Sequence, residues 1–148
     1  MISGFGDLNL SLTIAAIGSA FGTGIAGMAA IGAWKKAFMN NKSAPFILAA
    51  FVGAPLSQTI YGMVLQITIR GAELPADVPT YVFQMIIGFS AGIAMAASAY
   101  MQGKAGARAA DELAETGKGF GNYLIVIGIV ETVALFVMVF SMITLPGA

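Results

Sequence analysis

Residues 119–148 read GFGNYLIVIGIVETVALFVMVFSMITLPGA, and only one of them, Glu131, is charged. About 20 apolar residues rising about 1.5 Å each are enough to cross the hydrocarbon core of a bilayer. Three further uncharged runs precede this one, at residues 8–34, 43–69 and 78–103. We therefore predict an all-α integral membrane protein with four transmembrane helices, spanning roughly 9–34, 45–69, 80–103 and 121–145.

The composition of the 148-residue chain supports this fold class and excludes several functions. Only 9% of the residues are charged, against about 25% in ordinary soluble domains. Seven Lys and Arg balance seven Asp and Glu, so no basic surface is expected for nucleic acid. The absence of His and Cys excludes disulfides, haem ligation, thiolate or imidazole metal sites and Ser–His–Asp nucleophiles. We expect no catalytic residues.

The basic residues predict how the helices are oriented. Segment 35–44 holds three lysines, and segment 104–119 holds Lys104, Arg108 and Lys118, whereas connection 70–79 holds only Arg70. Cytoplasmic loops carry the excess of Lys and Arg. Both hairpin loops, 35–44 and 104–119, are therefore expected in the cytoplasm, and both termini outside a cell membrane that the chain crosses several times.

The chain divides into two similar halves, 1–72 and 73–148, and each is expected to form one helical hairpin. Each half contains a Gly/Ala-rich span, a basic turn and a bulkier span. An alignment places residues 58–64 (QTIYGMV) opposite residues 131–137 (ETVALFV), so that the glutamine of the first half meets the glutamate of the second. The order of elements indicates a duplication.

Small residues cover most of the first and third spans. In lipid, the close approach of small-residue faces drives helix association. We expect these two spans to pack against several neighbours at once, as in the inner ring of an oligomer, with the second and fourth spans in an outer, lipid-facing layer. The alternative is that Gly and Ala are simply common in membrane helices. The glycines concerned are Gly18, Gly22, Gly24, Gly27 and Gly32 in the first span, and Gly88, Gly92 and Gly103 in the third.

Glu131 is the only acidic or basic residue within a predicted span. A charge in a bilayer is costly, and such residues usually serve ion or substrate pathways. The alternative is a packing residue that burial keeps protonated.

Polar groups that could accompany Glu131 lie on the second span. Pro55 has no N–H and disrupts the preceding turn, which frees backbone carbonyls near Phe51 and Ala54. The residues that share one helix face, at i, i+3, i+4 and i+7, are Ala54, Ser57, Gln58 and Tyr61.

The third span offers a second amide, Gln102. The midpoint between Gln102 and Glu131 falls within 115–119, the expected turn, so these two side chains should lie level across an antiparallel pair. Lys104 follows closely, which is compatible with a site in the cytoplasmic half and helices that extend beyond the bilayer.

These groups form a set of hard oxygen ligands with one negative charge. Such a set suits a monovalent cation such as Na⁺, whereas Ca²⁺ sites generally recruit more carboxylates. The alternative for Gln58 and Gln102 is that they only hydrogen-bond the helices to one another.

Residues 55–62 (PLSQTIYG), 102–104 (QGK) and 130–132 (VET) together resemble the rotor-ring proteolipid of V-type ATPases (their K or c protein), and most closely its bacterial Na⁺-translocating kind. The resemblance implies a homo-oligomeric rotor ring of identical tetraspan subunits in lipid, each carrying one ion. The ring turns against a static membrane subunit that supplies an Arg, and a central-stalk subunit meets its cytoplasmic loops. Such a rotor protein has no catalytic site of its own and no cofactor; Na⁺ is its bound, transported ion.

The resemblance also implies a role for each candidate residue. Ser57 stands where close Na⁺-specific relatives have Thr, and Val133 stands where some have Tyr. The implied roles are the ion-carrying carboxylate for Glu131, amide-oxygen ligands for Gln58 and Gln102, a hydroxyl ligand for Ser57, a backbone carbonyl ligand for Ala54, and a hydrogen bond to Glu131 for Tyr61.

Three other interpretations remain open. The same rotor could carry H⁺, which needs only Glu131. A small tetraspan cation-coupled exporter also has one membrane Glu, although in that class it lies in the first span and the helices are less rich in glycine. A structural tetraspan scaffold would not need Glu131 level with Gln102.

Overall fold

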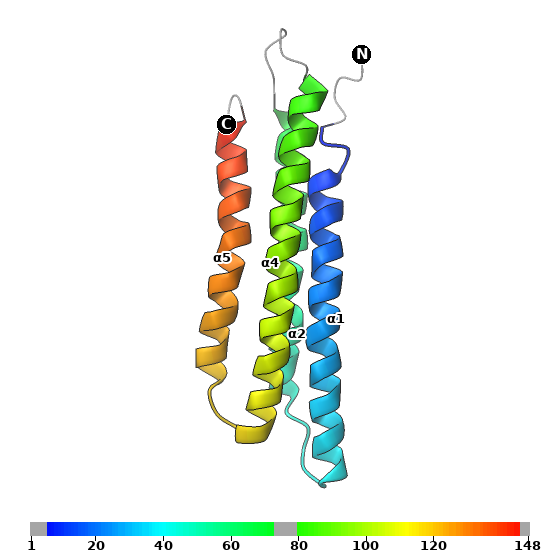
Figure 1. The fold of residues 1–148 in the computed structure, drawn as a ribbon, viewed down its shortest axis with the longest axis vertical. Coiled ribbons are helices and arrows are strands. Elements are labelled where there is room, and N and C mark those ends of the chain that lie inside the picture. The colour runs from blue at the N-terminus through cyan, green and yellow to red at the C-terminus, as the bar shows by residue number, and fades with distance from the viewer. Residues whose placement is uncertain (1–5, 73–79, 146–148) are drawn as a thin grey trace.

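The computed structural model describes residues 6–72 and 80–145, which form four long helical rods running side by side (Figure 1). The first rod is α1 (Leu10–Met39). The second is built from four consecutive pieces: η1 (Phe46–Leu48), α2 (Ala49–Gly53), η2 (Ala54–Leu56) and α3 (Ser57–Gly71). The last two rods are α4 (Thr80–Thr116) and α5 (Phe120–Thr144). All four are long and apolar enough to cross a membrane, which confirms the all-α tetraspan fold class.

The hairpin loops are shorter than the sequence predicts. α1 continues to Met39 and α4 to Thr116, so the prediction of a loop over 104–119 is wrong for most of that segment, as is the prediction for the first half of 35–44. Residues 104–116 (KAGARAADELAET) are rich in Ala, Leu, Glu and Arg, which favour helix. One face of this extension is buried, through Ala109, Ala110 and Leu113.

α1 and α4 approach each other most closely because glycines line their contact. A Cβ atom at Gly103 would overlap the backbone of Gly22, and a Cβ at Gly18 would overlap the backbone of Ala96. The small-residue spans therefore pack directly against each other within the chain, and α1 also contacts α3. Their packing against several neighbours in an inner ring stays a prediction.

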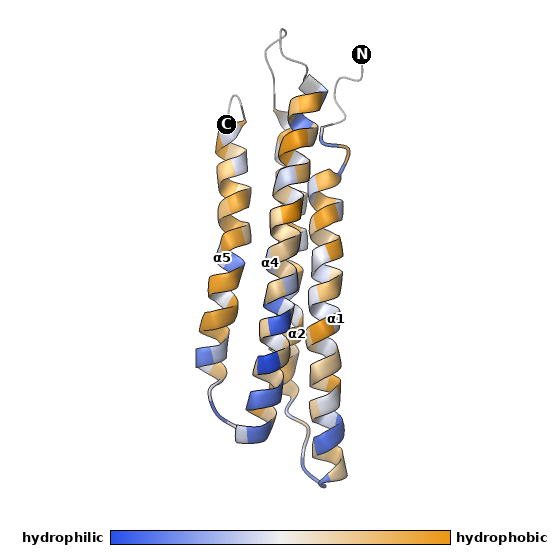
Figure 2. Cartoon of the chain, viewed as in Figure 1, coloured by the Kyte–Doolittle hydropathy of each residue, from blue (hydrophilic) through white to orange (hydrophobic). Residues whose placement is uncertain are grey.

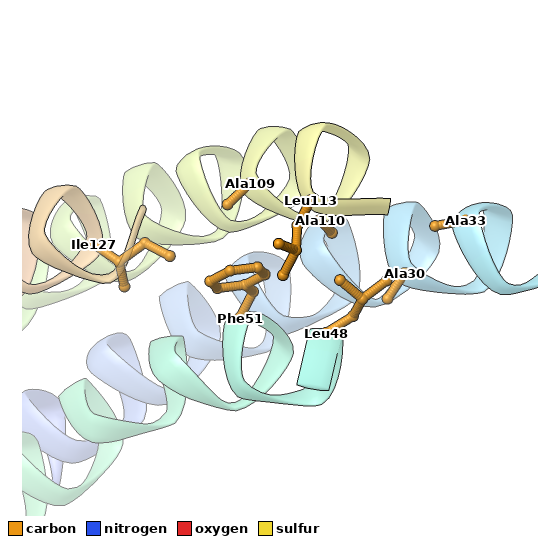
Figure 3. Close-up of a cluster of buried hydrophobic side chains, with 8 residues drawn as sticks. All are labelled: Ala30, Ala33, Leu48, Phe51, Ala109, Ala110, Leu113 and Ile127. Carbon is orange, nitrogen blue, oxygen red and sulfur yellow. The ribbon is translucent and has the colours of Figure 1, made fainter. Parts of the chain in front are cut away.

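Two apolar cores lie towards opposite ends of the bundle. The turn-end core surrounds Phe51 (Figure 3). The Phe51 ring also packs near Phe120 and Tyr123 of α5. The termini-end core centres on Leu65, Ile69 and Met95. The polar groups of Gln58, Gln102 and Glu131 fall between these two cores along each rod.

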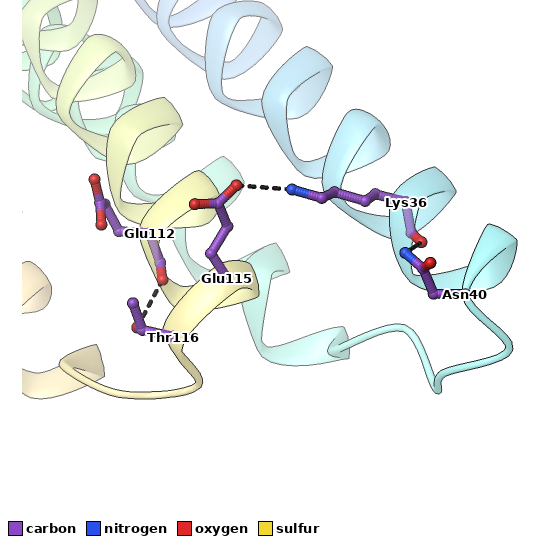
Figure 4. Close-up of polar contacts among 5 residues, drawn as sticks. All are labelled: Lys36, Asn40, Glu112, Glu115 and Thr116. Carbon is purple, nitrogen blue, oxygen red and sulfur yellow. Dashed lines mark hydrogen bonds and ion pairs between the residues drawn. The ribbon is translucent and has the colours of Figure 1, made fainter.

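The end of the bundle at which α1 and α4 finish is polar (Figure 2). There Lys36 and Glu115 form an ion pair with 2.7 Å between Nζ and Oε1, and both side chains are exposed (Figure 4). Asn40 and Thr116 each donate a side-chain hydrogen bond to a backbone carbonyl of their own helix, those of Lys36 and Glu112. This end thus presents charged groups beyond the apolar part of the helices.

A fully buried carboxylate, Asp7, lies at the beginning of α1. Its oxygens accept hydrogen bonds from the backbone N–H groups of Asn9 and Ser11, at 3.1 and 2.8 Å, and from the Ser11 hydroxyl. A Cβ at Gly88 would overlap the Asp7 side chain, so the glycine makes room for it against α4. Because acidic groups are favourable at a helix N-terminus, Asp7 acts as a cap for α1.

Candidate ion-binding site

The second rod supplies a hydroxyl and a carbonyl at the point where its α-helix is interrupted by a 3₁₀ turn. Pro55 lies in the short 3₁₀ turn η2 and cannot donate a hydrogen bond to the carbonyl one turn earlier. The carbonyl of Ala54 accepts both the backbone N–H and the hydroxyl of Ser57, the latter at 3.0 Å. Ser57 Oγ is also 3.2 Å from Gln58 Oε1, so these oxygens lie side by side.

The two glutamines meet in the middle of the bundle. Gln58 Nε2 donates to Gln102 Oε1 at 2.9 Å, and both side chains have no exposed surface. Buried amides without partners would be costly, and this contact satisfies one donor and one acceptor. α3 and α4 are thereby joined at this level.

The carboxylate of Glu131 is held from two helices. The Tyr61 hydroxyl of α3 donates to Oε1 at 2.7 Å, and Gln102 Nε2 of α4 lies 3.3 Å from Oε2. Gln102 Nε2 also donates to the backbone carbonyl of Ile127 at 3.2 Å. Gln102 and Glu131 therefore do lie level across the α4–α5 hairpin, and each carboxylate oxygen has a donor.

Ser98 belongs to the same group, although it is not among the residues predicted from the sequence. Its hydroxyl donates to the carbonyl of Val130 at 2.8 Å and lies 3.4 Å from Gln58 Nε2. Ser98 precedes Gln102 by four residues and so shares its helix face, which is the signal that could have identified it. It links the backbone of α5 to the glutamine pair.

The structure brings every predicted site residue into one connected group, which we call the Glu131 cluster. Its donor set is one carboxylate with neutral amide, hydroxyl and carbonyl oxygens. Within residues 6–72 and 80–145, no three His, Cys, Asp or Glu side chains converge. The cluster consists of Ala54, Ser57, Gln58, Tyr61, Ser98, Gln102 and Glu131.

Comparison with known proteins finds a family model that matches part of the chain. Residues 85–144, which cover most of α4 and all of α5, match the family model of the ATP synthase C-subunit. No curated protein matches the chain. The matched segment contains Gln102 and Glu131. The family forms oligomeric rings in rotary ATPases, and its members have no catalytic site of their own.

Four apolar helices and a carboxylate in the middle of the last one agree with that match. The ion-transporting proteolipids of this family are multi-pass membrane proteins. Residues 85–144 thus match the ATP synthase C-subunit family, and this match covers the second hairpin alone.

Proposed function

We propose that the chain is the membrane rotor subunit of a V-type ion-translocating ATPase and that each copy carries one Na⁺ on Glu131. The observation that supports this most directly is the connected group of oxygens around Glu131, between two apolar cores. The V-type assignment rests on the resemblance of the motifs and on the four spans, because the family model matches only the second hairpin.

The proposal of Na⁺ follows from the number and charge of the oxygens. Na⁺ must exchange its water shell for about five or six hard oxygen ligands, which is the preference of non-transition cations. One carboxylate neutralises one monovalent ion. The donors for this role are Glu131, the amide oxygens of Gln58 and Gln102, the Ser57 hydroxyl and the Ala54 carbonyl.

Tyr61 has a different role in this proposal. The Tyr61 hydroxyl is 2.7 Å from Glu131 Oε1, so the other carboxylate oxygen, Oε2, faces Gln102 Nε2. A hydrogen bond to a charged acceptor contributes about 1.5–3 kcal/mol. Tyr61 therefore holds the carboxylate in the orientation that faces the amides.

The ion-to-helix ratio favours a pump. The first hairpin carries Gln58 where the second carries Glu131, so one ion is carried per four helices. Moving one charge across 100 mV takes about 2.3 kcal/mol. A ring with fewer carboxylates moves fewer ions per ATP, so each ion receives more of the driving energy and can be moved against a steeper gradient.

The partners follow from the same proposal. Identical subunits form the ring in lipid, and a static membrane subunit supplies an Arg that displaces the ion from Glu131. A central-stalk subunit meets the hairpin-turn end on the cytoplasmic side, where Lys36 and Glu115 are exposed. A polar surface suits this contact because it remains outside the bilayer.

The test uses the whole purified complex and a carboxyl-directed carbodiimide, which reacts with the protonated form of an acid. Bound Na⁺ should displace the proton from Glu131 and protect it from labelling, and half-protection should need more Na⁺ as the pH falls. Gln58→Ala and Gln102→Ala should each weaken protection but leave the labelling reaction intact. Labelling that is indifferent to Na⁺ from acidic to alkaline pH would exclude Na⁺ and leave a rotor that carries H⁺.

A further inference from the structure

Ser19 of α1 has a buried hydroxyl with no hydrogen-bond partner. Its side chain is 2% exposed, and among the described residues its Oγ is the one buried side-chain polar atom left unpaired. Buried polar groups are nearly always hydrogen-bonded, so an exception calls for a physical reason.

The contacts around Ser19 place it level with the Glu131 cluster. Two α1 residues that flank Ser19, Ala15 and Gly22, lie against Gly62 and Pro55 of the second rod. Gln58 lies midway between Pro55 and Gly62 in the sequence. Gly18 and Gly22 of α1 lie against the backbone of Ala96 and Ala99 in α4, and Ser98 lies between these two alanines in the sequence. Ser19 is thus buried at the same height as the Gln58 carboxamide, on the side away from the helix that carries Glu131.

Cation binding would change the hydrogen bonds that the Gln58 carboxamide can make. In the structure its Nε2 donates to Gln102 Oε1, the oxygen that a cation at Glu131 would also use. A cation held by that oxygen and by Glu131 would lie close to the positive end of this N–H dipole and would repel it. The Gln58 amide then has to turn its oxygen towards the cation and find other acceptors for its N–H groups.

Ser98 provides only one of the acceptors that a turned carboxamide needs. Its Oγ lies 3.4 Å from Gln58 Nε2 in the present orientation of the amide, and it gives its own hydrogen to the carbonyl of Val130 at 2.8 Å, which leaves lone pairs free for a Gln58 N–H. A carboxamide carries two N–H donors. The second donor needs an acceptor on the α1 side, where Ser19 is level and unpaired.

We propose that Ser19 is a positioning residue that accepts an N–H of Gln58 when Na⁺ occupies the Glu131 cluster. This inference rests on the proposed function. It gives α1, which contributes no ligand, a part in cation affinity. It also explains why a hydroxyl stands unpaired on a buried helix face that, apart from Ser11, otherwise consists of Gly and Ala.

The experiment compares Na⁺ protection of Glu131 from carbodiimide in the wild-type complex and in Ser19→Ala. Because a buried N–H would lose its acceptor in the occupied site, the half-protecting Na⁺ concentration should rise about five- to tenfold. Labelling without Na⁺, and its pH profile, should not change, since protonating Glu131 does not require Gln58 to turn. Alanine is smaller than serine and the best helix former, so assembly should be kept.

Thr23→Val is the matched control. The Thr23 hydroxyl lies one turn further along α1 and donates to carbonyls of its own helix, those of Ser19 and Ala20. Its loss should leave Na⁺ protection as in the wild type.

A double variant separates positioning from packing. In a Gln58→Ala background, adding Ser19→Ala should produce no further change, because the two residues act through one contact. If Ser19→Ala raised the half-protecting Na⁺ concentration equally in the wild-type and Gln58→Ala backgrounds, its role would be packing and the inference would be overturned. If Na⁺ protected Ser19→Ala as well as it protects the wild type, the inference about Ser19 would be overturned and the proposed function would stand. A wild type that Na⁺ does not protect would overturn the proposed function and this inference together.

Discussion

Glu131 has a hydrogen-bond donor at each carboxylate oxygen, Tyr61 at Oε1 and Gln102 at Oε2. The two donors come from different helices, so the position of the carboxylate depends on how α3 and α4 sit beside α5. A carboxylate in lipid is costly unless it is paired or neutralised. Two donors reduce that cost but leave one negative charge, which a bound cation or proton would neutralise.

At this scale the clearest prediction concerns Glu131→Gln. The change is nearly isosteric and neutral, so the Tyr61 hydroxyl keeps an acceptor and the ring should assemble as in the wild type. Coupled ion transport should be lost, because the amide neither binds a cation tightly nor exchanges a proton. ATP-driven ion uptake into vesicles that contain the whole complex measures this, and uptake at the wild-type rate would place the ion site elsewhere.

The helices α1 and α4 form the closest-packed pair of elements, and glycine makes this possible. Backbone atoms of Gly22 occupy the place where a Gly103 side chain would stand. The same closeness sets the register of the polar groups, because Gln102 directly precedes Gly103 in α4. Tight packing between α1 and α4 therefore helps to hold Gln102 in its position within the Glu131 cluster.

We predict that Gly103→Ala destabilises the bundle by about 1–3 kcal/mol, the usual cost of overpacking against a backbone that cannot move aside. Thermal unfolding of the detergent-solubilised complex, followed by circular dichroism, should show a lower midpoint. Gly24→Ala is the control, since a Cβ there meets nothing within 4 Å. Its midpoint should be unchanged or higher, because alanine favours helix. Equal midpoints in the two variants would contradict the close contact.

Over the whole molecule, α5 is the rod with the most exposed apolar surface. Among its large side chains, Ile125, Ile129, Phe136, Phe140 and Ile143 are all exposed in the single chain. In lipid such a surface is satisfied by acyl chains or by other subunits. The membrane ring of the proposed function would provide both environments.

Native mass spectrometry of the detergent-extracted protein tests the assembly. The expected result is one closed oligomer of many identical 15.2 kDa subunits, because ring formation is the property of the matched family. A dimer would favour the small tetraspan exporter, and a monomer would favour a structural scaffold.

Local properties of the sequence were enough to determine the four spans and the main candidate residues. Helix length in a bilayer depends on uninterrupted apolar residues, and an isolated Glu131 stands out against such a background. The positions of Gln58 and Tyr61 on one face follow from helical periodicity alone. The pairing of Gln102 with Glu131 followed from the position of a single turn.

Only the tertiary structure decided which polar groups touch and where the helices end. The hydroxyl of Ser98 resembles any other small residue of the third span until α5 places the Val130 carbonyl beside it. Asp7 reads as a charge outside the membrane, and its burial depends on the space that Gly88 leaves on α4. Residues 104–116 read as a charged loop, yet they remain helical because α1 and Phe51 bury one of their faces. In each case the deciding contact joins segments far apart in the chain, and such distances are set by packing rather than by local sequence.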